Sequence, residues 1–262
     1  MKKMRINIDN VQRTIDEYYD SNISPDLSLI EDILNSIKSG DIRSVQYINN
    51  KYIVNTWVKK AILLAFKYFP CKEQESNAYD KFGLLKYDYS NYKYRKVPGA
   101  FIRDYVYIGQ NAIIMPSYIN IGAYIGDNTM IDINATVGSC AQIGNNCHVS
   151  ANACIGGVLE PAVAMPVIIE DNCFIGANSA ILEGVIVEEN SIISAGVTIT
   201  SSTKIIDRES SKVYKSIIPK GSVVVPGSYQ SKSNLNINCA IIIKRNSNID
   251  KININDVLRN IG

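Results

Sequence analysis

The segment from Tyr118 to Val149, YINIGAYIGDNTMIDINATVGSCAQIGNNCHV, carries Ile or Val at every sixth residue. With two shifts of phase, the same spacing covers residues 102–205. A period of six fits neither an α-helix nor a simple alternating strand, and it is typical of the hexapeptide repeat of a β-solenoid. The seventeen aliphatic positions are Ile102, Ile108, Ile114, Ile119, Ile125, Ile131, Val137, Ile143, Val149, Ile155, Ile169, Ile175, Ile181, Val187, Ile193, Ile199 and Ile205.

The residues around these positions fit the same repeat. Gly directly follows many of the aliphatic residues, and small or β-branched side chains lie two residues before them. In the left-handed form of the solenoid, three hexads make one triangular coil, with the aliphatic residue inward on each flat side and Gly or a polar residue at the corner. Stacked coils then bury a continuous apolar column. We therefore predict a left-handed parallel β-helix over residues 101–206.

The two shifts of phase differ in size. The step from Ile114 to Ile119 is five residues, whereas the step from Ile155 to Ile169 is fourteen. The longer interval, GGVLEPAVAMPV, contains two prolines, which are poor residues inside a central strand. We predict that this interval is a loop outside the prism, and loops on a rigid scaffold often carry function.

Residues 1–100 are predicted to form an N-terminal α-rich domain followed by a connector. Helical spacing covers residues 7–20, and Ser24 and Pro25 predict the N-cap and first residue of a second helix that stops at Gly40. Two strands are expected about Asn49-Asn50, and a third helix over residues 58–69. The rest of this region, 71–100, is rich in Tyr and predicts an irregular connector.

Residues 207–262 are predicted to form a small C-terminal β/α tail. Turn residues surround two short strands, and the segment NCAIIIKR predicts one further strand. The segment NINDVLRNI predicts a short closing helix. The tail is too short for an independent domain, so we expect it to pack on the last coil.

Composition and charge argue against several classes of function. The net charge of +2 gives no electrostatic reason to expect nucleic acid binding. No apolar run is long enough for a membrane span, and the basic N-terminus lacks the apolar region of a secretory signal. The six Cys form no CxxC pair and the chain has a single His, so we expect no metal site. Reduced thiols are expected, as in a cytoplasmic protein.

The solid apolar core leaves no internal pocket, so chemistry is expected on the outside of the prism. Asp132 follows an inward Ile at mid-prism, and it is either an Asx-turn residue or a general base. Glu183 has a similar position on the next face along. His148, the single His, is either a base or merely exposed. Arg95, in YRKVP, is either a surface residue or a bidentate ligand of a carboxylate.

Several long segments closely resemble the tetrahydrodipicolinate N-succinyltransferases of bacterial lysine and diaminopimelate synthesis. The resemblance covers residues from about 94 to 261, and it extends more loosely to the N-terminal part. The segments that carry it are MPSYINIGAYIGDNTMIDINATVGSCAQIG, IGGVLEP, IIEDNCFIGANS, LEGVIVEE, STKIIDRE and PKGSVVVPGS.

The resemblance implies a homotrimer with active sites between neighbouring prisms. It implies succinyl-CoA as donor and 2-amino-6-oxopimelate, from hydrated tetrahydrodipicolinate, as acceptor. Asp132 matches the Asp that handles the acceptor's amino group, and Arg95 matches an Arg that contacts the acceptor. The segments that match the CoA groove supply Gly156, Gly157, Ser202, Thr203 and Lys204.

One departure from the family pattern affects the acceptor. The family reads GARSEVVEG where this chain reads GANSAILEG, so Ala180 stands in place of a functionally important Glu. Glu183 corresponds to the second Glu of that motif and is retained. The catalytic candidates are therefore Asp132 and Glu183.

Three hypotheses follow. The first is succinyl transfer from succinyl-CoA to the amine of tetrahydrodipicolinate. The second is a related N-acyltransferase that uses acetyl-CoA or succinyl-CoA with another amino acid, as in a natural-product pathway. The third is a non-catalytic solenoid used for assembly, and Ala180 alone supports it.

Overall fold

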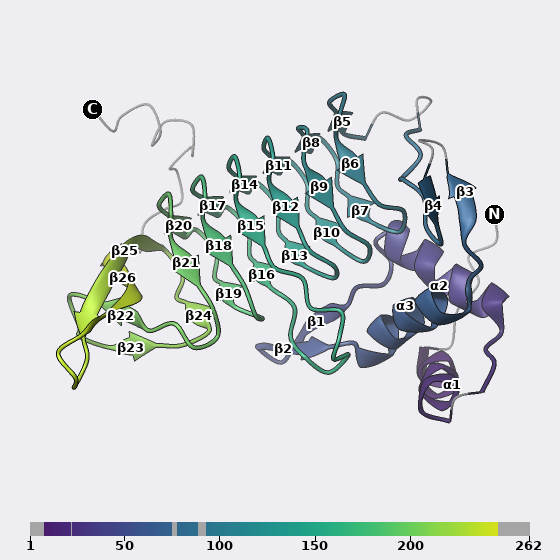
Figure 1. Ribbon diagram of the computed structural model, residues 1–262, viewed down its shortest axis with the longest axis horizontal. Coiled ribbons are helices and arrows are strands. Elements are labelled where there is room, and N and C mark those ends of the chain that lie inside the picture. Colours follow the sequence, from purple (N-terminus) through teal and green to yellow (C-terminus); the bar gives the residue numbers. More distant parts are fainter. Residues whose placement is uncertain (1–7, 22, 75–77, 89–92, 246–262) are drawn as a thin grey trace.

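The computed structural model describes residues 8–21, 23–74, 78–88 and 93–245. A parallel β-helix forms the body of the molecule, with three helices against one end and a long β-hairpin at the other (Figure 1). Each coil passes through three sheets, which we call faces 1, 2 and 3 in the order in which the chain meets them from Phe101.

Most of the strands that build the three faces are two residues long. Face 1 contains β6 (Phe101–Ile102), β9 (Tyr118–Ile119), β12 (Thr136–Val137), β15 (Cys154–Ile155), β18 (Ala180–Ile181) and β21 (Thr198–Ile199). Face 2 contains β7 (Tyr107–Ile108), β10 (Tyr124–Ile125), β13 (Gln142–Ile143), β16 (Ile168–Ile169), β19 (Ile186–Val187) and β24 (Ile217–Ile218). Face 3 contains β5 (Arg95–Lys96), β8 (Ile113–Ile114), β11 (Met130–Ile131), β14 (His148–Val149), β17 (Phe174–Ile175), β20 (Ile192–Ile193), β25 (Ser222–Gln230), β26 (Asn236–Arg245), β22 (Ile205–Asp207) and β23 (Val213–Tyr214).

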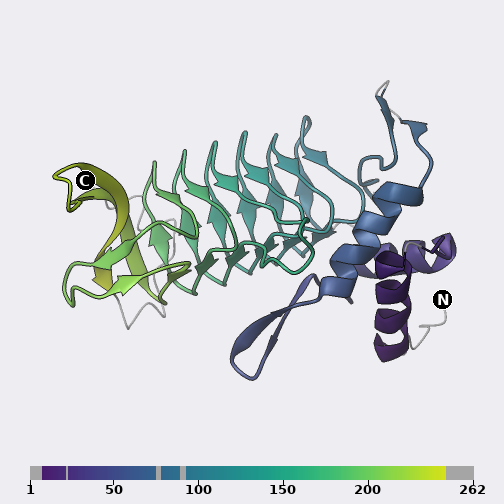
Figure 2. The ribbon, with the colours of Figure 1, turned by 60° about the horizontal axis from the view of Figure 1, so that its bottom comes forward.

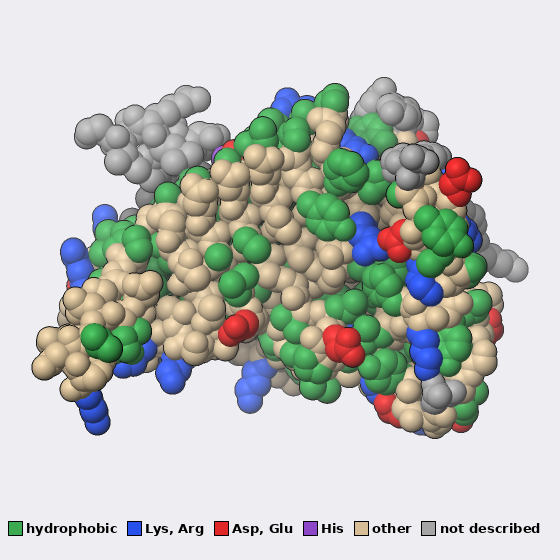
Figure 3. Space-filling view, in the orientation of Figure 1, with side chains coloured by type: hydrophobic (Ala, Val, Ile, Leu, Met, Phe, Trp, Pro, Cys, Tyr) green, Lys and Arg blue, Asp and Glu red, His purple; other side chains and the backbone are tan. Residues whose placement is uncertain are grey.

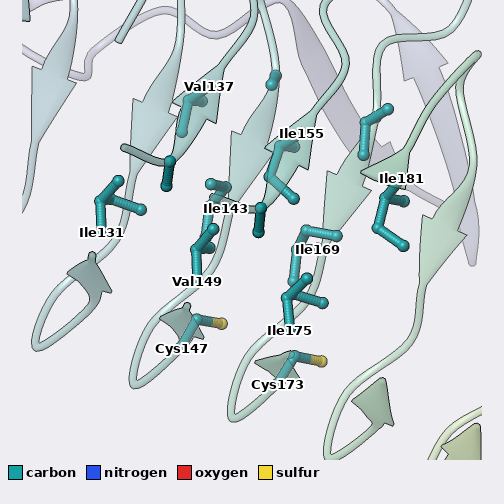
Figure 4. Packing of buried hydrophobic residues seen from close by; sticks show 14 of the residues in the cluster. Ile131, Val137, Ile143, Cys147, Val149, Ile155, Ile169, Cys173, Ile175 and Ile181 are labelled. Atoms are coloured by element: carbon teal, nitrogen blue, oxygen red, sulfur yellow. The ribbon is translucent and has the colours of Figure 1, made fainter. Parts of the chain in front are cut away.

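The predicted aliphatic column is confirmed. All seventeen positions are buried, and sixteen of them are the last residue of a strand that belongs to a stacked coil. Figure 4 shows neighbouring Ile and Val side chains stacked between coils. Ile205 is the exception: it is buried, but its strand β22 pairs with β26 and β23 instead of continuing face 2. The regular coil therefore ends one hexad earlier than the spacing predicts.

Asn occupies many corners for a conformational reason. Asn128, Asn146 and Asn172 each lie three residues after an inward aliphatic residue and have φ of 55°, 54° and 58°. Asn tolerates this left-handed region better than other residues that have a side chain. The same conformation recurs at Asn111, Asn134, Asn152, Asn178 and Asn190. The sequence predicted polar corners, and the backbone explains why so many of them are Asn.

The long shift of phase is a loop, as predicted. Ile125 pairs with Ile143, eighteen residues later, whereas Ile143 pairs with Ile169, twenty-six residues later. Eight additional residues therefore leave the prism between β15 and β16. We call residues 156–167 the excursion loop.

The N-terminal region contains the predicted helices and hairpin: α1 (Ile8–Asp20), α2 (Leu27–Lys38), β1 (Val45–Ile48), β2 (Lys51–Val54) and α3 (Thr56–Tyr68). The predicted start of the second helix is wrong. Asp26 is the N-cap, because its side chain accepts a hydrogen bond from the Ser28 N–H, and Ser24 and Pro25 lie before the helix. None of the described helices has the length and apolar character needed to span a membrane.

The connector is more regular than predicted. It contains the antiparallel pair β3 (Lys72–Gln74) and β4 (Ala78–Asp80), and it ends in β5, which pairs with β8 as the first rung of face 3. The helices form their own apolar core, and three buried residues of the solenoid, Tyr105, Ile121 and Cys140, complete it. Figure 2 shows the helices across the end of the prism with the β1–β2 hairpin projecting beside it.

The C-terminal strands extend the prism, in agreement with a tail that packs on the last coil. β24 pairs with β19 on face 2, and β25 pairs with β20 on face 3. β25 and β26 then form a long antiparallel hairpin. The predicted closing helix over residues 253–261 lies outside the described residues.

Candidate active site

Asp132 and His148 lie side by side at the edge where face 3 turns into face 1. Asp132 directly follows β11, and His148 is on β14, the next strand of face 3. The Ile133 N–H donates to Asp132 Oδ1 at 2.7 Å, while Asp132 Oδ2 lies 3.6 Å from His148 Nε2. Asp132 therefore serves the corner turn with one oxygen and presents the other toward an imidazole.

The pair remains accessible at the surface. The side chains of Asp132 and His148 are 26% and 21% exposed. On its other side, His148 makes an edge contact with the Phe174 ring, with centroids 5.3 Å apart. A half-buried carboxylate with a neighbouring imidazole can accept a proton from an incoming nucleophile.

Arg95 belongs to the same face as the pair. It lies on β5, which is separated from β11 by β8 alone, so Arg95 and Met130 are two strand spacings apart, roughly 10 Å. Arg95 is exposed and lines a pocket of about 810 Å³ together with Lys93 and Lys96. Three cationic side chains around one pocket favour an anionic ligand, and a guanidinium suits a carboxylate.

A second group of candidate residues lies along the edge between faces 1 and 2. Gly156 and Gly157 follow β15, Glu183 follows β18 and Ser202 follows β21, so the three segments occupy consecutive coils. The Ser201 hydroxyl donates to Glu183 Oε2 at 2.6 Å, and the Ser201 N–H donates to the same oxygen at 3.2 Å. Glu183 thus lies between the two segments predicted to bind CoA.

The backbone of Glu183 is strained. Its φ is 53°, a region that side chains other than Asn, Asp and Gly rarely adopt, and Gly184 follows with φ of 70°. Strained non-Gly residues cluster at functional sites. The strain and the exposed carboxylate support Glu183 as a candidate residue of this edge.

Packing between coils explains why residues 156 and 157 are glycines. A Cβ on Gly157 would lie 2.1 Å from the Ser139 N atom, and a Cβ on Gly156 would lie 3.1 Å from the Leu182 Cα atom. Gly157 is therefore needed for the coils to approach, whereas a side chain at Gly156 would make a tight contact with Leu182. A contact with CoA stays a prediction for these two residues.

Three further predicted CoA residues make contacts within the chain. Ser202 Oγ lies 3.0 Å from the Thr200 hydroxyl, and Thr203 Oγ1 accepts a hydrogen bond from the Thr200 N–H at 2.9 Å. Lys204 Nζ lies 3.9 Å from the centre of the Tyr229 ring, so its ammonium packs against β25.

The structure thus collects the predicted residues into two groups and keeps the groups apart. Arg95 and Asp132 belong to the face-3 side, whereas the glycines, Glu183 and residues 202–204 belong to the edge between faces 1 and 2. Face 1 lies between the groups, and Ala180 is on it. Its outward strand residues are uncharged, and Figure 3 shows the middle of the prism with few charged side chains.

The adjacency of Asp132 and His148 is the feature that reasoning from the sequence missed. Met130 and His148 are eighteen residues apart, one full coil, and they pair in register. Counting one coil forward from the residues beside Asp132 would have found the pair. Within the described ranges, no group of three or more His, Cys, Asp and Glu side chains is arranged to hold a metal ion.

Comparison with family models gives three matches. Residues 4–68 match the model described as tetrahydrodipicolinate N-succinyltransferase N-terminal. Residues 122–157 match bacterial transferase hexapeptide (six repeats), and residues 166–201 match the hexapeptide repeat of succinyl-transferase.

Curated relatives match most of the chain. A 2,3,4,5-tetrahydropyridine-2,6-dicarboxylate N-succinyltransferase from Wolbachia sp. subsp. Brugia malayi is 48% identical over 243 residues, which cover 88% of each protein. A protein of the same description from Buchnera aphidicola subsp. Baizongia pistaciae is 49% identical over 242 residues, again with 88% of each covered.

Among solved structures, a Campylobacter jejuni protein assigned as a 2,3,4,5-tetrahydropyridine-2-carboxylate N-succinyltransferase superposes with a TM-score of 0.52. The superposition covers 83% of this chain and 63% of that protein at 16% sequence identity. With the hexapeptide-model matches, this likeness identifies the solenoid as the predicted left-handed β-helix.

Proposed function

This chain belongs to the 2,3,4,5-tetrahydropyridine-2,6-dicarboxylate N-succinyltransferase family, and we propose that it transfers succinyl from succinyl-CoA to the amine of 2-amino-6-oxopimelate. The acceptor is the hydrated, ring-opened form of tetrahydrodipicolinate, and the reaction belongs to diaminopimelate and lysine synthesis. The observation that carries the proposal is an identity of nearly one half along 88% of the chain. The protein is an acyltransferase with an acyl-CoA co-substrate.

Asp132 is the proposed general base. An amine must be neutral to attack, so the free oxygen of Asp132 accepts the proton that the amine loses. The neutral nitrogen then bonds to the thioester carbon and loses one further proton as the carbon–sulfur bond breaks, and the CoA thiolate takes up that proton and leaves as the thiol. His148 Nε2 lies 3.6 Å from Asp132 Oδ2 and is placed to orient the carboxylate.

Arg95 is the proposed ligand of an acceptor carboxylate. Its pocket and Asp132 belong to the same face, and Arg95 is two strand spacings from Met130, two residues before Asp132. A dicarboxylate held at one end by a guanidinium would place its amine toward Asp132. The proposal needs no residue from another face to bind the acceptor.

The donor is proposed to lie along the edge between faces 1 and 2. Gly156, Gly157, Ser202, Thr203 and Lys204 mark this edge, with the exposed Glu183 between them. Backbone N–H groups of the Gly156-Gly157 turn are the proposed stabilisers of the oxyanion. The fold supports this use because both glycines hold the turn close to the neighbouring coil.

A homotrimer is proposed because one chain leaves the two groups of residues apart. Prisms packed side by side would bring the Asp132 edge of one chain toward the donor edge of the next. The uncharged outward residues of face 1 support close packing, because no charge would lose water there. We further propose a cytoplasmic location, consistent with six unpaired cysteines.

The direct test is an assay of CoA thiol release with freshly prepared tetrahydrodipicolinate. We expect turnover with succinyl-CoA and much slower turnover with acetyl-CoA. Release of CoA that does not depend on the acceptor would contradict the proposal, as would a preference for acetyl-CoA.

A second candidate acceptor, another amino acid, is favoured by Ala180 alone. Ala180 is on face 1, between Cys154 and Thr198 in register, where the family has an acid. If the chain acts on tetrahydrodipicolinate, Ala180→Glu should raise that activity. If Ala180→Glu instead abolishes activity on a better acceptor found in a panel of amino acids, the second candidate replaces the first.

A further inference from the structure

Lys59 is a fully buried lysine, with 0% of its surface exposed, on α3 in the N-terminal region. Lysine is almost never fully buried unless it is paired. Among the residues that the structure describes, no carboxylate lies within ion-pair distance of its ammonium. The ammonium must therefore be satisfied by other groups.

Backbone carbonyls of the excursion loop satisfy it. Lys59 Nζ donates to Ala164 O at 2.7 Å and lies 3.4 Å from Pro161 O. The Ala164 N–H itself donates to Pro161 O at 3.0 Å, so both carbonyls belong to one tight turn. A single side chain from the helical region thus holds the turn at the tip of the loop.

Both ends of the excursion loop reach the edge that we assign to the donor. The loop begins at Gly156-Gly157, packed against Ser139 on the preceding coil. Near its other end, Met165 O lies 2.6 Å from the position of a Cβ on Gly184, the residue after Glu183. A displacement of the turn would therefore disturb the glycine turn and the Glu183 corner together.

Packing alone does not require a cation at this position. Burial lowers the pKa of Lys59, which means that the protein interior disfavours the charged form. Leu159 already anchors the loop through apolar contact with the helical core. A methionine of similar length would fill the space without burying a charge. The hydrogen bonds to the turn are what methionine could not supply.

We propose that Lys59 is a positioning residue for the acyl donor: by holding the Pro161–Ala164 turn, it fixes the excursion loop and with it the donor-binding edge of the prism. The inference rests on the proposed function in naming the donor. It assigns to the N-terminal helices a part in binding of the CoA thioester, although they lie across the end of the prism.

The test compares Lys59→Met with Lys60→Met. Lys60 is the next residue of α3, but its ammonium pairs with Asp16 and Asp20 on α1 and not with the loop. We expect Lys59→Met to raise the KM for succinyl-CoA about tenfold, since small misplacements of binding groups have effects of this order or larger. The acceptor KM should not change, and Lys60→Met should leave both constants as in the wild type.

A second variant and a second measurement separate positioning from simple packing. Lys59→Gln keeps an N–H donor, so it should recover part of the donor affinity, and it replaces Lys59→Met if that variant does not fold. Hydrogen exchange at the Ala164 amide should accelerate in Lys59→Met. A lower Tm with an unchanged succinyl-CoA KM would overturn the inference and leave Lys59 as packing.

Failure of the proposed function gives a different result. If the wild type releases CoA with no acceptor in the panel, the function is wrong, and calorimetry with CoA alone then decides the inference. Weaker CoA binding by Lys59→Met than by the wild type would support it, while equal binding or none by either protein would overturn it.

Discussion

Asp132 is a corner residue with both a structural role and a proposed chemical role. Its Oδ1 closes the turn onto the Ile133 N–H, and its Oδ2 faces His148. From the sequence, an Asx turn and a general base were alternatives. The observed hydrogen bond goes to the next residue and not two residues on, so it is a local contact of the corner and not an Asx turn, and it leaves Oδ2 available as a base.

The variant Asp132→Asn separates the structural role of Asp132 from its proposed role as a base. The amide oxygen can still accept the hydrogen bond of the turn, but the side chain cannot take a proton. We expect turnover to fall roughly a hundredfold or more, with an unchanged Tm. Asp127→Asn is the matched control, since Asp127 also binds a backbone N–H at a corner, that of Gln110, on a different edge. Wild-type turnover in Asp132→Asn would reduce Asp132 to a turn residue.

Arg95→Lys tests the acceptor pocket. Lysine keeps the charge but loses the two-pronged donor geometry, so the KM for the acceptor should rise about tenfold, the scale of one charged hydrogen bond. The KM for succinyl-CoA should stay the same. Arg103→Lys is the control, because Arg103 pairs with Asp80 on β4. A change in the donor constant alone would contradict the assignment of Arg95.

At the scale of the element, strand β12 presents two adjacent side chains to opposite environments. Val137 is fully buried in the aliphatic column, whereas Thr136 is exposed on face 1. This alternation follows from the period of two along any strand. Each coil contains three such strands, and each strand supplies one inward aliphatic residue to the column.

Val137→Asp should prevent folding, because an unpaired carboxylate in the column has no partner and no water, at a cost of several kcal/mol or more. Thr136→Asp on the same strand should leave the fold of the chain intact. Circular dichroism and the yield of soluble protein would measure both. A folded Val137→Asp variant would mean that the column does not hold the coils together.

At the scale of the whole molecule, the separation of the two residue groups makes assembly a requirement of the proposed chemistry. Asp132 and Glu183 lie on different edges, with face 1 between them. A single prism has a solid core, so no closure within one chain can bring them together.

Sedimentation at micromolar concentration should therefore give the mass of three chains. Thr136→Arg on face 1 should weaken assembly, because a charge would be buried between prisms. Turnover should fall with it while the chain remains folded. A fully active monomer would contradict both the trimer and a site shared between chains.

The sequence by itself determined the coil. A period of six with a β-branched aliphatic residue at each repeat has one efficient solution, in which each coil buries its residues against the next, so local pattern and fold agree. Local sequence patterns also predicted the helices, the Asn49-Asn50 hairpin and the excursion loop. They failed at the Asp26 cap and at β5, where a single hydrogen bond or a neighbouring strand decides the structure.

The tertiary structure alone decided which candidate residues meet. The offset between paired strands of neighbouring coils is seventeen, eighteen, twenty-six or thirty-one residues, depending on the insertion that each coil contains. Stacking therefore pairs Asp132 with His148, and it places Glu183 between the predicted CoA segments instead of beside Asp132. It also joins Lys59 to Ala164, 105 positions along the chain. Such contacts depend on the lengths of all the turns and loops between the two residues. No local sequence pattern gives that total length.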